Sequence, residues 1–404
     1  MKKMILVNVL ALLLFTAKAQ FRTDNVLYRT VYPENLCTEL SSAKDYLLLD
    51  VRSPMEFSDE PSGMGLQFGH LKNAVNINVK DLGKRLSEIK DYKDKPVYVY
   101  CSHSQRSRRA SRMLADSGFT KVVNINGGIT AILQLPPGPC KNDLLVGNVP
   151  YRVISPVALC NALTGYKAKT FLLDVRSDSA YFHIDKDPEV NSIGTFRSGV
   201  HIPAADLEKR INEVPQGKDI IIIDVDDNDG AKAAQVLLSH GFKNISALQE
   251  GLDRFLEADP NRLSCIQSEY VSPVRYHVLS AYEFGLLSRT SPGYIPLDIR
   301  TDDEFNNKSK DDYRNIGHLK NAVHIPTEEL PKRSSGLDKN KPFVIYGFSA
   351  SKTAYEAANY LTAQGFTDLY LLRGGIFNLR WTAANVFGYQ WLNGLVIDVP
   401  KENY

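Results

Sequence analysis

A reactive cysteine is the strongest chemical signal in the sequence. Cys101 directly follows the apolar run 97–100, and the chain then reads Ser102, His103, Ser104, Gln105 and Arg106, with Ser107 opening a helical pattern. At the start of a helix, exposed backbone N–H groups and the positive end of the helix dipole stabilise an anion. Together with the charge of Arg106 they favour the nucleophilic thiolate of Cys101. The alternative interpretation is a buried, inert cysteine.

The segment around Cys101 belongs to a unit that occurs three times. An apolar run ending in an acid and an arginine occurs as LLLDVR at 47–52, FLLDVR at 171–176 and IPLDIR at 295–300. A glycine-led segment follows at 69–77, 194–203 and 317–326. A second apolar run, a loop, a helical pattern and a Gly-Phe pair then occupy 97–119, 220–242 and 343–366. The acids Asp50, Asp174 and Asp298 are 124 residues apart, a spacing that is typical of a domain and too long for a solenoid repeat.

Short strands alternate with helical patterns within each unit. In the first unit, 46–51 and 97–100 are predicted strands, and Ala110, Met113 and Leu114 have helical spacing, with Gly118 as the expected helix C-cap. This alternation predicts an α/β fold, as three tandem domains that each contain a mainly parallel sheet flanked by helices. Ligands of such sheets bind beyond the carboxyl ends of the strands, which is where Cys101 is expected.

The N-terminus has the pattern of a secretory signal. Lys2 and Lys3 precede the apolar run 4–15, and the small residues at 17–19 predict cleavage before Gln20. The run is short for a membrane span, and a buried N-terminal helix is the alternative. We therefore expect an exported protein, periplasmic or secreted, with no membrane anchor after cleavage of the signal.

Composition is that of ordinary globular domains, with 43% hydrophobic residues, 23% charged residues and a net charge of +2. Nothing in this balance indicates a nucleic-acid partner. The repeats and the Pro/Gly/Asn-rich stretches between them predict the following organisation: a signal peptide at 1–19, domain 1 at 20–136 with the active cysteine, a linker at 137–150, domain 2 at 151–258, a linker at 259–275, domain 3 at 276–385 and a C-terminal tail at 386–404.

The chain resembles three tandem copies of the rhodanese-like (sulfurtransferase) domain over about residues 25–385. The resemblance rests on the Asp-Val-Arg strand end, the segment 69–74 (GHLKNA), the loop from Cys101 to Arg106, and the pair Gly127-Gly128, which occurs again as Gly374-Gly375. In that family, the cysteine takes a sulfane sulfur from a donor, holds it as a persulfide and passes it to a nucleophilic acceptor. Cys101 and Arg106 enclose four residues, as in sulfurtransferases, whereas the related phosphatases enclose five. Ser104 departs from the family, since many single-domain members have glycine there.

Comparison of the three repeats separates scaffold from chemistry. Cys101, His103, Gln105 and Arg106 occur only in the first repeat. We therefore assign Cys101 and Arg106 to catalysis, and place the substrate-binding residues in the same loop: Ser102, His103, Ser104, Gln105 and Ser107. For His103, a simple surface position is the alternative. Arg108, Arg109 and Arg112 either attract an anionic donor or form a solvated helix face. The acid-arginine pairs recur in all repeats, which favours a structural ion pair over catalysis.

The loops of repeats 2 and 3 lack the thiol. Repeat 2 has Asp224 in place of Cys101, and its acidic loop 224–230 does not match a calcium-binding EF-hand, so no metal site is assigned. Repeat 3 has Gly347 at this position and a lysine, Lys352, near the place of Arg106. Anion binding without turnover is one interpretation of repeat 3, and a purely structural copy is the other.

The remaining cysteines form two matched sets. Cys37 and Cys160 occupy equivalent helix positions in repeats 1 and 2, and Cys140 and Cys265 occupy equivalent positions after them, while repeat 3 lacks both. This pattern predicts disulfides Cys37–Cys140 and Cys160–Cys265, each worth on the order of 4 kcal/mol in the chain-entropy model, with Cys101 left free. Unpaired core cysteines are the alternative.

Together these observations predict an exported sulfurtransferase. A small anionic donor such as thiosulfate would supply the sulfur, and cyanide or a thiol, either small or carried by a protein, would accept it. This scheme requires no metal or organic cofactor. A non-catalytic multi-domain scaffold or sulfur carrier that binds a protein partner is the alternative. Phosphatase or arsenate-reductase chemistry is disfavoured by the short loop.

Overall fold

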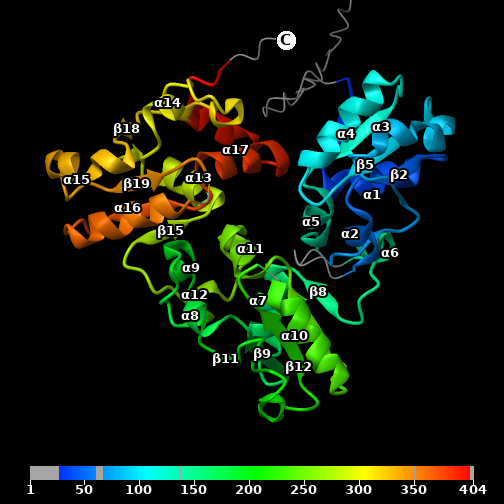
Figure 1. Ribbon diagram of the computed structural model, residues 1–404, viewed down its shortest axis with the longest axis horizontal. Coiled ribbons are helices and arrows are strands. Elements are labelled where there is room, and N and C mark those ends of the chain that lie inside the picture. The colour runs from blue at the N-terminus through cyan, green and yellow to red at the C-terminus, as the bar shows by residue number, and fades with distance from the viewer. Residues whose placement is uncertain (1–26, 61–66, 137, 227, 350, 401–404) are drawn as a thin grey trace, which may run out of the picture.

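The computed structural model describes residues 27–400 apart from 61–66, 137, 227 and 350. The predicted signal peptide, residues 1–19, lies outside the described residues. Within the described part, no helix is long and apolar enough to cross a bilayer. Three domains in chain order surround a common centre, coloured from blue through green to red (Figure 1).

Each domain contains a five-stranded parallel sheet, and the three sheets share one strand order. That order is β1-β6-β5-β2-β4 in domain 1, and the equivalent strands follow it in domains 2 and 3. The strands of domain 1 are β1 (Arg29–Val31), β2 (Leu47–Asp50), β4 (Val75–Asn76), β5 (Val97–Tyr100) and β6 (Val122–Ile125). Those of domain 2 are β8 (Arg152–Ile154), β9 (Thr170–Asp174), β11 (Gly199–His201), β12 (Asp219–Ile223) and β13 (Ile245–Leu248). Those of domain 3 are β15 (His277–Leu279), β16 (Ile295–Asp298), β18 (Val323–His324), β19 (Phe343–Tyr346) and β20 (Leu369–Leu372). The predicted α/β fold with three repeated domains is confirmed.

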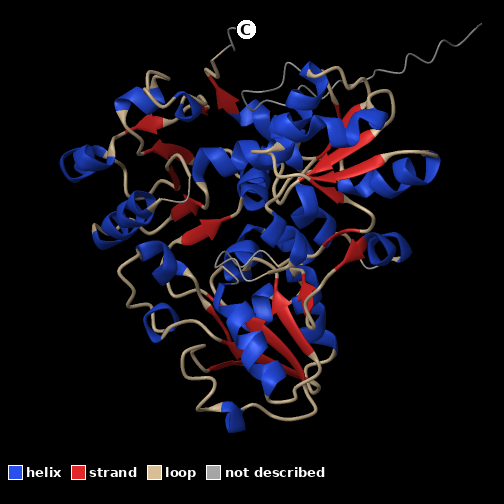
Figure 2. Cartoon of the chain, turned by 45° about the vertical axis from the view of Figure 1, so that its right-hand side comes forward, coloured by secondary structure: helices blue, strands red, loops and turns tan. Residues whose placement is uncertain are grey.

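Helices cover both faces of each sheet (Figure 2). In domain 1 they are α1 (Pro33–Ser42), α2 (Pro54–Ser58), α3 (Leu82–Arg85), α4 (Gln105–Asp116) and α5 (Gly128–Leu133). In domain 2 they are α7 (Pro156–Gly165), α8 (Asp178–Tyr181), α9 (Pro188–Ser192), α10 (Asn228–Ser239) and α11 (Gly251–Glu257). In domain 3 they are α13 (Ala281–Thr290), α14 (Asp302–Phe305), α15 (Leu330–Arg333), α16 (Lys352–Ala363) and α17 (Gly375–Asn385).

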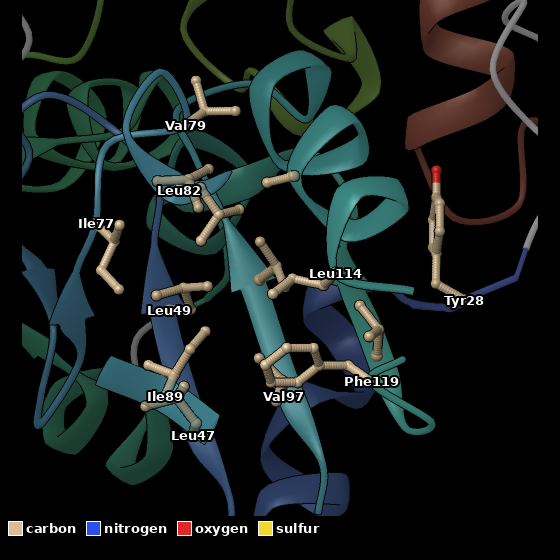
Figure 3. Packing of buried hydrophobic residues seen from close by; sticks show 14 of the residues in the cluster. Tyr28, Leu47, Leu49, Ile77, Val79, Leu82, Ile89, Val97, Leu114 and Phe119 are labelled. Atoms are coloured by element: carbon tan, nitrogen blue, oxygen red, sulfur yellow. The ribbon is translucent and has the colours of Figure 1, made fainter. Parts of the chain in front are cut away.

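The apolar strands are buried on both sides because alternate side chains point to opposite faces. Leu49 and Val97 pack with Leu114 of α4 on one face (Figure 3). Leu48 and its neighbours pack with Leu36 of α1 and the apolar side of α5 on the other face. This two-sided burial holds the end of β5, and hence Cys101, between two helical layers.

Helix α4 ends one residue earlier than predicted, because its C-cap is Ser117 and the expected C-cap glycine, Gly118, follows it. Gly118 has φ 88°, a left-handed conformation that glycine adopts without a steric penalty. The N–H of Gly118 donates to the Ala115 carbonyl at 3.0 Å, and that of Phe119 donates to Leu114 at 3.1 Å. These bonds satisfy the last carbonyls of the helix that begins at the Cys101 loop.

The segments expected as linkers and tail carry ordered elements. They contain α6 (Pro139–Leu144), β7 (Leu145–Val146), α12 (Ile266–Glu269), β14 (Tyr270–Val271) and β21 (Val396–Ile397). The three strands pair antiparallel with strands of the glycine-led segments: β3 (His70–Leu71), β10 (Thr195–Phe196) and β17 (His318–Leu319). Each segment therefore folds back on the domain before it, because this pairing satisfies backbone groups of both short strands.

The cysteines agree with the predicted pattern where the structure describes them. Cys160 and Cys265 form a disulfide, which confirms that prediction and ties α7 to the turn before α12. Cys37 is also disulfide-bonded, but the side chain of its predicted partner, Cys140, lies outside the described residues. Cys101 is the free cysteine of the described part.

Hydrogen bonds and ion pairs join every pair of domains. Domain 1 contacts domain 2 where Gln249 Nε2 donates to the Thr130 carbonyl at 3.1 Å. Domain 2 contacts domain 3 through Arg373 and Asp253, whose side chains meet at 2.6 Å. Domain 3 returns to domain 1 where Asn126 Nδ2 donates to the Ala384 carbonyl at 3.0 Å. The three domains thus form a closed ring, with α5, α11 and α17 toward its centre (Figure 1).

Candidate functional site

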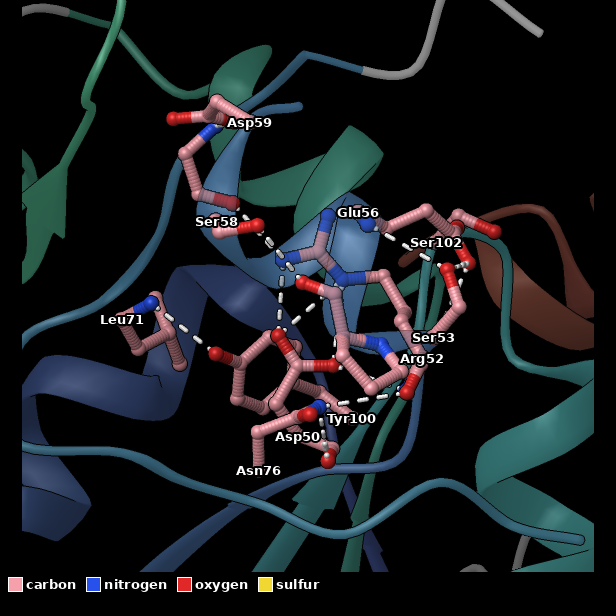
Figure 4. A network of polar contacts seen from close by, with 12 residues as sticks. Asp50, Arg52, Ser53, Glu56, Ser58, Asp59, Leu71, Asn76, Tyr100 and Ser102 are labelled. Carbon is pink, nitrogen blue, oxygen red and sulfur yellow. Dashed lines mark hydrogen bonds and ion pairs between the residues drawn. The ribbon is translucent and has the colours of Figure 1, made fainter. Parts of the chain in front are cut away.

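A buried ion pair supports the strand ends around the cysteine loop. Arg52 and Asp50 have fully buried side chains, and Arg52 Nη2 lies 2.7 Å from Asp50 Oδ2 (Figure 4). The same guanidinium donates to the Gly69 carbonyl at 2.7 Å. Equivalent pairs occur in the other domains, between Asp174 and Arg176 and between Asp298 and Arg300. The predicted structural ion pair is confirmed, and it links β2 to the glycine-led segment.

Cys101 lies at the carboxyl end of β5, directly before the loop that leads into α4. Its side chain is only 1% exposed, and its Sγ is 3.6 Å from the Ser107 hydroxyl. Ser107 Oγ is in turn 2.7 Å from Asn124 Oδ1 on β6. The serine thus connects the thiol to the neighbouring strand, and the N-terminus of the 12-residue helix α4 faces the loop.

Gly128 allows helix α5 to reach the backbone of this loop. The Ile129 N–H donates to the Cys101 carbonyl at 2.9 Å. Gly128 has φ 61°, and a Cβ atom at this position would lie 2.2 Å from the same carbonyl oxygen. Any larger residue would push α5 away, so the second glycine of the Gly127-Gly128 pair is required by this close approach.

Ser104 adopts a backbone conformation that normally favours glycine. Its φ is 81°, in the left-handed region, and a residue other than glycine there costs on the order of 1–3 kcal/mol. The Ser104 hydroxyl accepts a hydrogen bond from the Gly127 N–H. This bond fixes the loop tip and accounts for a serine in a backbone conformation that favours glycine.

Arg106 is held by Glu56 at the start of α2. Arg106 Nη1 and Nη2 lie 2.6 Å and 2.7 Å from the two carboxylate oxygens of Glu56, and Nη2 also donates to Ser102 Oγ at 2.9 Å. Glu56 is part of a capping box with Ser53. Burial alone would raise the pKa of Glu56, but the bonds from Arg106 and Ser53 outweigh it and lower the pKa from 4.5 to about 2.

Replacement of Glu56 by glutamine is expected to destabilise domain 1 in a pH-dependent way. The lowered pKa of the buried carboxyl corresponds to about 3 kcal/mol. Because the folded-state pKa lies below the unfolded one, this stabilisation is complete above about pH 5 and is lost as the pH falls toward 2. Urea unfolding of the wild type and the variant at pH 7 and pH 3 measures the difference in their free energies of unfolding. This difference should fall by at least about half at pH 3. A difference that is independent of pH would contradict the ionised pair.

His103 contacts the second domain rather than solvent alone. Its Nε2 bonds to a carboxylate oxygen of Glu250 and lies 3.3 Å from Thr130 Oγ1. Its backbone carbonyl accepts a hydrogen bond from Trp381 Nε1 of domain 3 at 3.3 Å. The cysteine loop of domain 1 is therefore fixed by contacts from domains 2 and 3, whose equivalent loops have no cysteine. Gln105 is exposed beside it.

Three residues of this arrangement were not identified from the sequence: Glu56, Glu250 and Trp381. Glu56 stands in a Ser-x-x-Glu capping box, but nothing local shows that its carboxylate also reaches Arg106. Glu250 occupies the place of Gly127 and Gly374 in the repeats and has φ 53°. A glutamate at a glycine position was a usable signal, whereas the contact of Trp381 depends only on how the domains are arranged.

The loops of domains 2 and 3 have a different chemistry. Asp224 is buried, and its Oδ2 accepts a hydrogen bond from the Gly230 N–H at 2.7 Å. A carboxylate therefore occupies the place that the Cys101 thiol has in domain 1. In domain 3, Lys352 Nζ is 3.4 Å from Glu356 on its own helix. Asp227 and Ala350 of these loops lie outside the described residues. Within the described part, no group of three or more His, Cys, Asp or Glu side chains is arranged to hold a metal ion.

Comparison with known proteins agrees with this geometry. The model of the rhodanese-like domain matches residues 35–135, 157–258 and 286–381, which together exceed half of the chain. The chain belongs to the rhodanese-like domain family. Its relatives include proteins described as sulfurtransferases, so this protein with three rhodanese-like domains is a member of a sulfurtransferase family.

Two curated relatives of this chain have the length of one domain. An uncharacterised protein of Bacillus subtilis strain 168, YqhL, is 34% identical over 123 residues, which are 30% of this chain and 89% of the relative. A sulfurtransferase of Allochromatium vinosum is 33% identical over 98 residues, which are 24% of this chain and 81% of the relative. Among solved structures, a thiosulfate sulfurtransferase from Pseudomonas aeruginosa aligns with 86% of this chain and 66% of its own, with 16% identity and a TM-score of 0.22.

Proposed function

We propose that this protein is an exported sulfurtransferase that carries sulfane sulfur on Cys101. The observation that supports this most directly is the position of the free thiol, at the end of β5 and before the N-terminus of α4. Arg106 closes the loop, and its charge is held in place by Glu56. Relatives with the length of a single domain carry the name sulfurtransferase.

The proposed first half-reaction charges the enzyme. The Cys101 thiolate attacks the outer sulfur of a donor such as thiosulfate and forms a new S–S bond. The old bond between that sulfur and the sulfonyl sulfur breaks, and its electron pair leaves with sulfite. Cys101 becomes a persulfide, whose negative terminal sulfur is stabilised by the N-terminus of α4 and the charge of Arg106.

The second half-reaction returns the thiolate. An acceptor thiolate or cyanide attacks the terminal sulfur, and the bond to Cys101 Sγ breaks with its electron pair remaining on Cys101. The acceptor leaves as a persulfide or as thiocyanate. The two steps transfer one sulfur atom without net oxidation, so they need no cofactor.

Export is part of the proposal and rests on the sequence. The charged, apolar and small-residue order at 1–19 is that of a secretory signal. The Cys160–Cys265 disulfide supports the same proposal, because disulfides persist in oxidising compartments. Expression of the full chain in a bacterial host and N-terminal sequencing of the protein in the periplasmic fraction tests it. A mature chain that begins at Gln20 is the expected result.

Intact mass of the purified mature protein tests the chemistry. After thiosulfate treatment we expect a gain of one sulfur, about 32 Da, located on the peptide that contains Cys101 and removed by cyanide. No gain with thiosulfate or an organic thiosulfonate, in folded protein whose Cys101 is reduced, would sink the sulfurtransferase proposal. The burial of Cys101 would then favour a non-catalytic scaffold that binds a protein partner.

A further inference from the structure

A cavity at the centre of the ring adjoins the cysteine loop. It has a volume of about 650 Å³ and is lined by residues of all three domains. Domain 1 contributes the loop residues His103, Ser104 and Gln105, and α4 contributes Arg109. This volume is in the range of sites for small organic molecules. The two domains without a thiol supply most of the remaining wall.

One wall offers positive charge with unfilled hydrogen-bonding capacity. Arg254 on α11 is 8% exposed and lines the cavity. Its Nε is buried without a hydrogen-bond partner, and its nearest carboxylates, of Glu257 and Glu250, are 3.5 Å and 3.8 Å away. Glu250 is already bonded to His103. The Nε atom itself has no accessible surface, so a ligand carboxylate would bind the Nη groups of Arg254 in competition with Glu250 and Glu257. Arg109 adds an exposed positive charge.

A second wall carries an excess of negative charge. Asp253 lies on α11, and Asp226 lines the same cavity from the loop of domain 2. Burial raises the pKa of Asp253 to about 6 despite its contact with Arg373, since Glu189, Glu257 and Asp226 add repulsion. A ligand ammonium group near these carboxylates would relieve this repulsion.

The third wall comes from domain 3 and combines an apolar surface with the polar side chains of Asn378, Arg380 and Asn385. Phe377 and Trp381 of α17 line it together with Ile316 and the half-exposed Tyr313. The indole N–H of Trp381 is bonded to the His103 carbonyl, so the rest of the ring presents an apolar surface. The cavity therefore combines a carboxylate-binding side, an ammonium-binding side and an apolar side around one space.

From these walls we infer that the cavity binds the sulfur acceptor, and that this acceptor is a small zwitterionic thiol of the amino-acid type. Its carboxylate would contact Arg254 and Arg109, its ammonium group would face Asp253 and Asp226, and its thiol would approach the loop of Cys101. This inference rests on the proposed persulfide chemistry and adds the class of acceptor.

The balance of charges argues against the sulfur donor as the occupant. Four arginines and four carboxylates line the cavity, so their formal charges cancel. The cavity therefore lacks the excess of positive charge that would concentrate a dianion such as thiosulfate. A zwitterion matches both signs at once. Thiosulfate also lacks an apolar part to cover the aromatic wall.

Discharge of the preformed Cys101 persulfide by a series of small thiols tests the inference. The probes are L-cysteine with both charges, 3-mercaptopropionate with the carboxylate only, cysteamine with the ammonium only, and 2-mercaptoethanol with neither. Loss of 32 Da is followed by mass, with each rate corrected for thiolate fraction and divided by the rate with cyanide. We expect saturation with L-cysteine at a concentration at least about tenfold below that for the singly charged thiols.

Variants separate binding from folding. Arg254→Gln and the exposed Arg109→Gln should each raise the half-saturating concentration for L-cysteine and 3-mercaptopropionate about fivefold or more, without affecting cysteamine. Arg112→Gln is the matched control on α4, because Arg112 lies outside the cavity lining and pairs with Asp116 at 3.9 Å. Equal, non-saturating rates for all four thiols from an intact persulfide would overturn the cavity inference alone. Failure to form the persulfide would overturn the proposed function, and the acceptor site with it.

Discussion

Replacement of Cys101 by alanine is expected to abolish sulfur transfer, with thiocyanate formation from thiosulfate and cyanide reduced by at least about 10³-fold. In the described part of the chain Cys101 is the free thiol, and the equivalent positions in domains 2 and 3 are Asp224 and Gly347. None of the described residues therefore offers a second free thiol that could take over the sulfur. Thiocyanate assays on both proteins, at equal concentrations of folded protein, measure the loss.

Asp224→Ala is the matched control for this variant. Asp224 occupies the same place in domain 2, after β12, but offers no sulfur nucleophile. We expect this variant to retain the wild-type rate of persulfide formation if it keeps its native melting temperature. Retention of transfer by Cys101→Ala, or loss of persulfide formation in well-folded Asp224→Ala, would contradict the assignment of chemistry to domain 1.

Asp50→Asn is expected to destabilise domain 1 by about 3–5 kcal/mol, the cost of removing one partner of a buried ion pair. Asp50 and Arg52 both have fully buried side chains. The substitution leaves the guanidinium charge in the core with only neutral acceptors, one of which is the Gly69 carbonyl. Gly69 directly precedes β3, which pairs with β7. Loss of the Asp50 carboxylate should therefore also weaken the pairing of β3 with β7.

Pulse proteolysis across a urea series provides the measurement for this prediction. Cleavage of peptides from domain 1, followed by mass, reports the opening of that domain. We expect the midpoint to shift to lower urea in Asp50→Asn and to stay unchanged in Glu88→Gln, which removes an exposed ion pair with Arg85. Equal midpoints for Asp50→Asn and wild type would show that the pair is replaceable by neutral hydrogen bonds.

The altered domains have a structural reason to be present. Glu250 of domain 2 and Trp381 of domain 3 both bond to His103 in the loop of domain 1. Glu250 keeps a left-handed backbone where the other repeats have glycine, and such a conformation is costly for this residue type. We interpret domains 2 and 3 as partners that fix the catalytic loop and build the wall of the cavity beside it.

Much of the fold was determined by local patterns in the sequence. The alternation of apolar strands such as 97–100 with helical patterns predicted parallel sheets, because side-chain periodicity directly reflects which faces are buried. Helical spacing in the first repeat placed Gly118 at the end of α4, one residue after the C-cap Ser117. The Asp50–Arg52 pair and the Cys160–Cys265 disulfide followed from the comparison of repeats. The place of Cys101 also followed, since only the first repeat has a cysteine after this strand.

Tertiary structure decided what surrounds Cys101. Sequence spacing does not show that Glu56 holds Arg106, because the two residues are 50 positions apart and meet only when α2 packs beside the loop. The contacts of His103 with Glu250 and Trp381 join residues 147 and 278 positions apart. Such contacts depend on the closed ring, whose interfaces are made of single polar and apolar side chains without periodicity. The repeats therefore determined the three domains and the place of Cys101, while the packing of the domains against one another determined its surroundings.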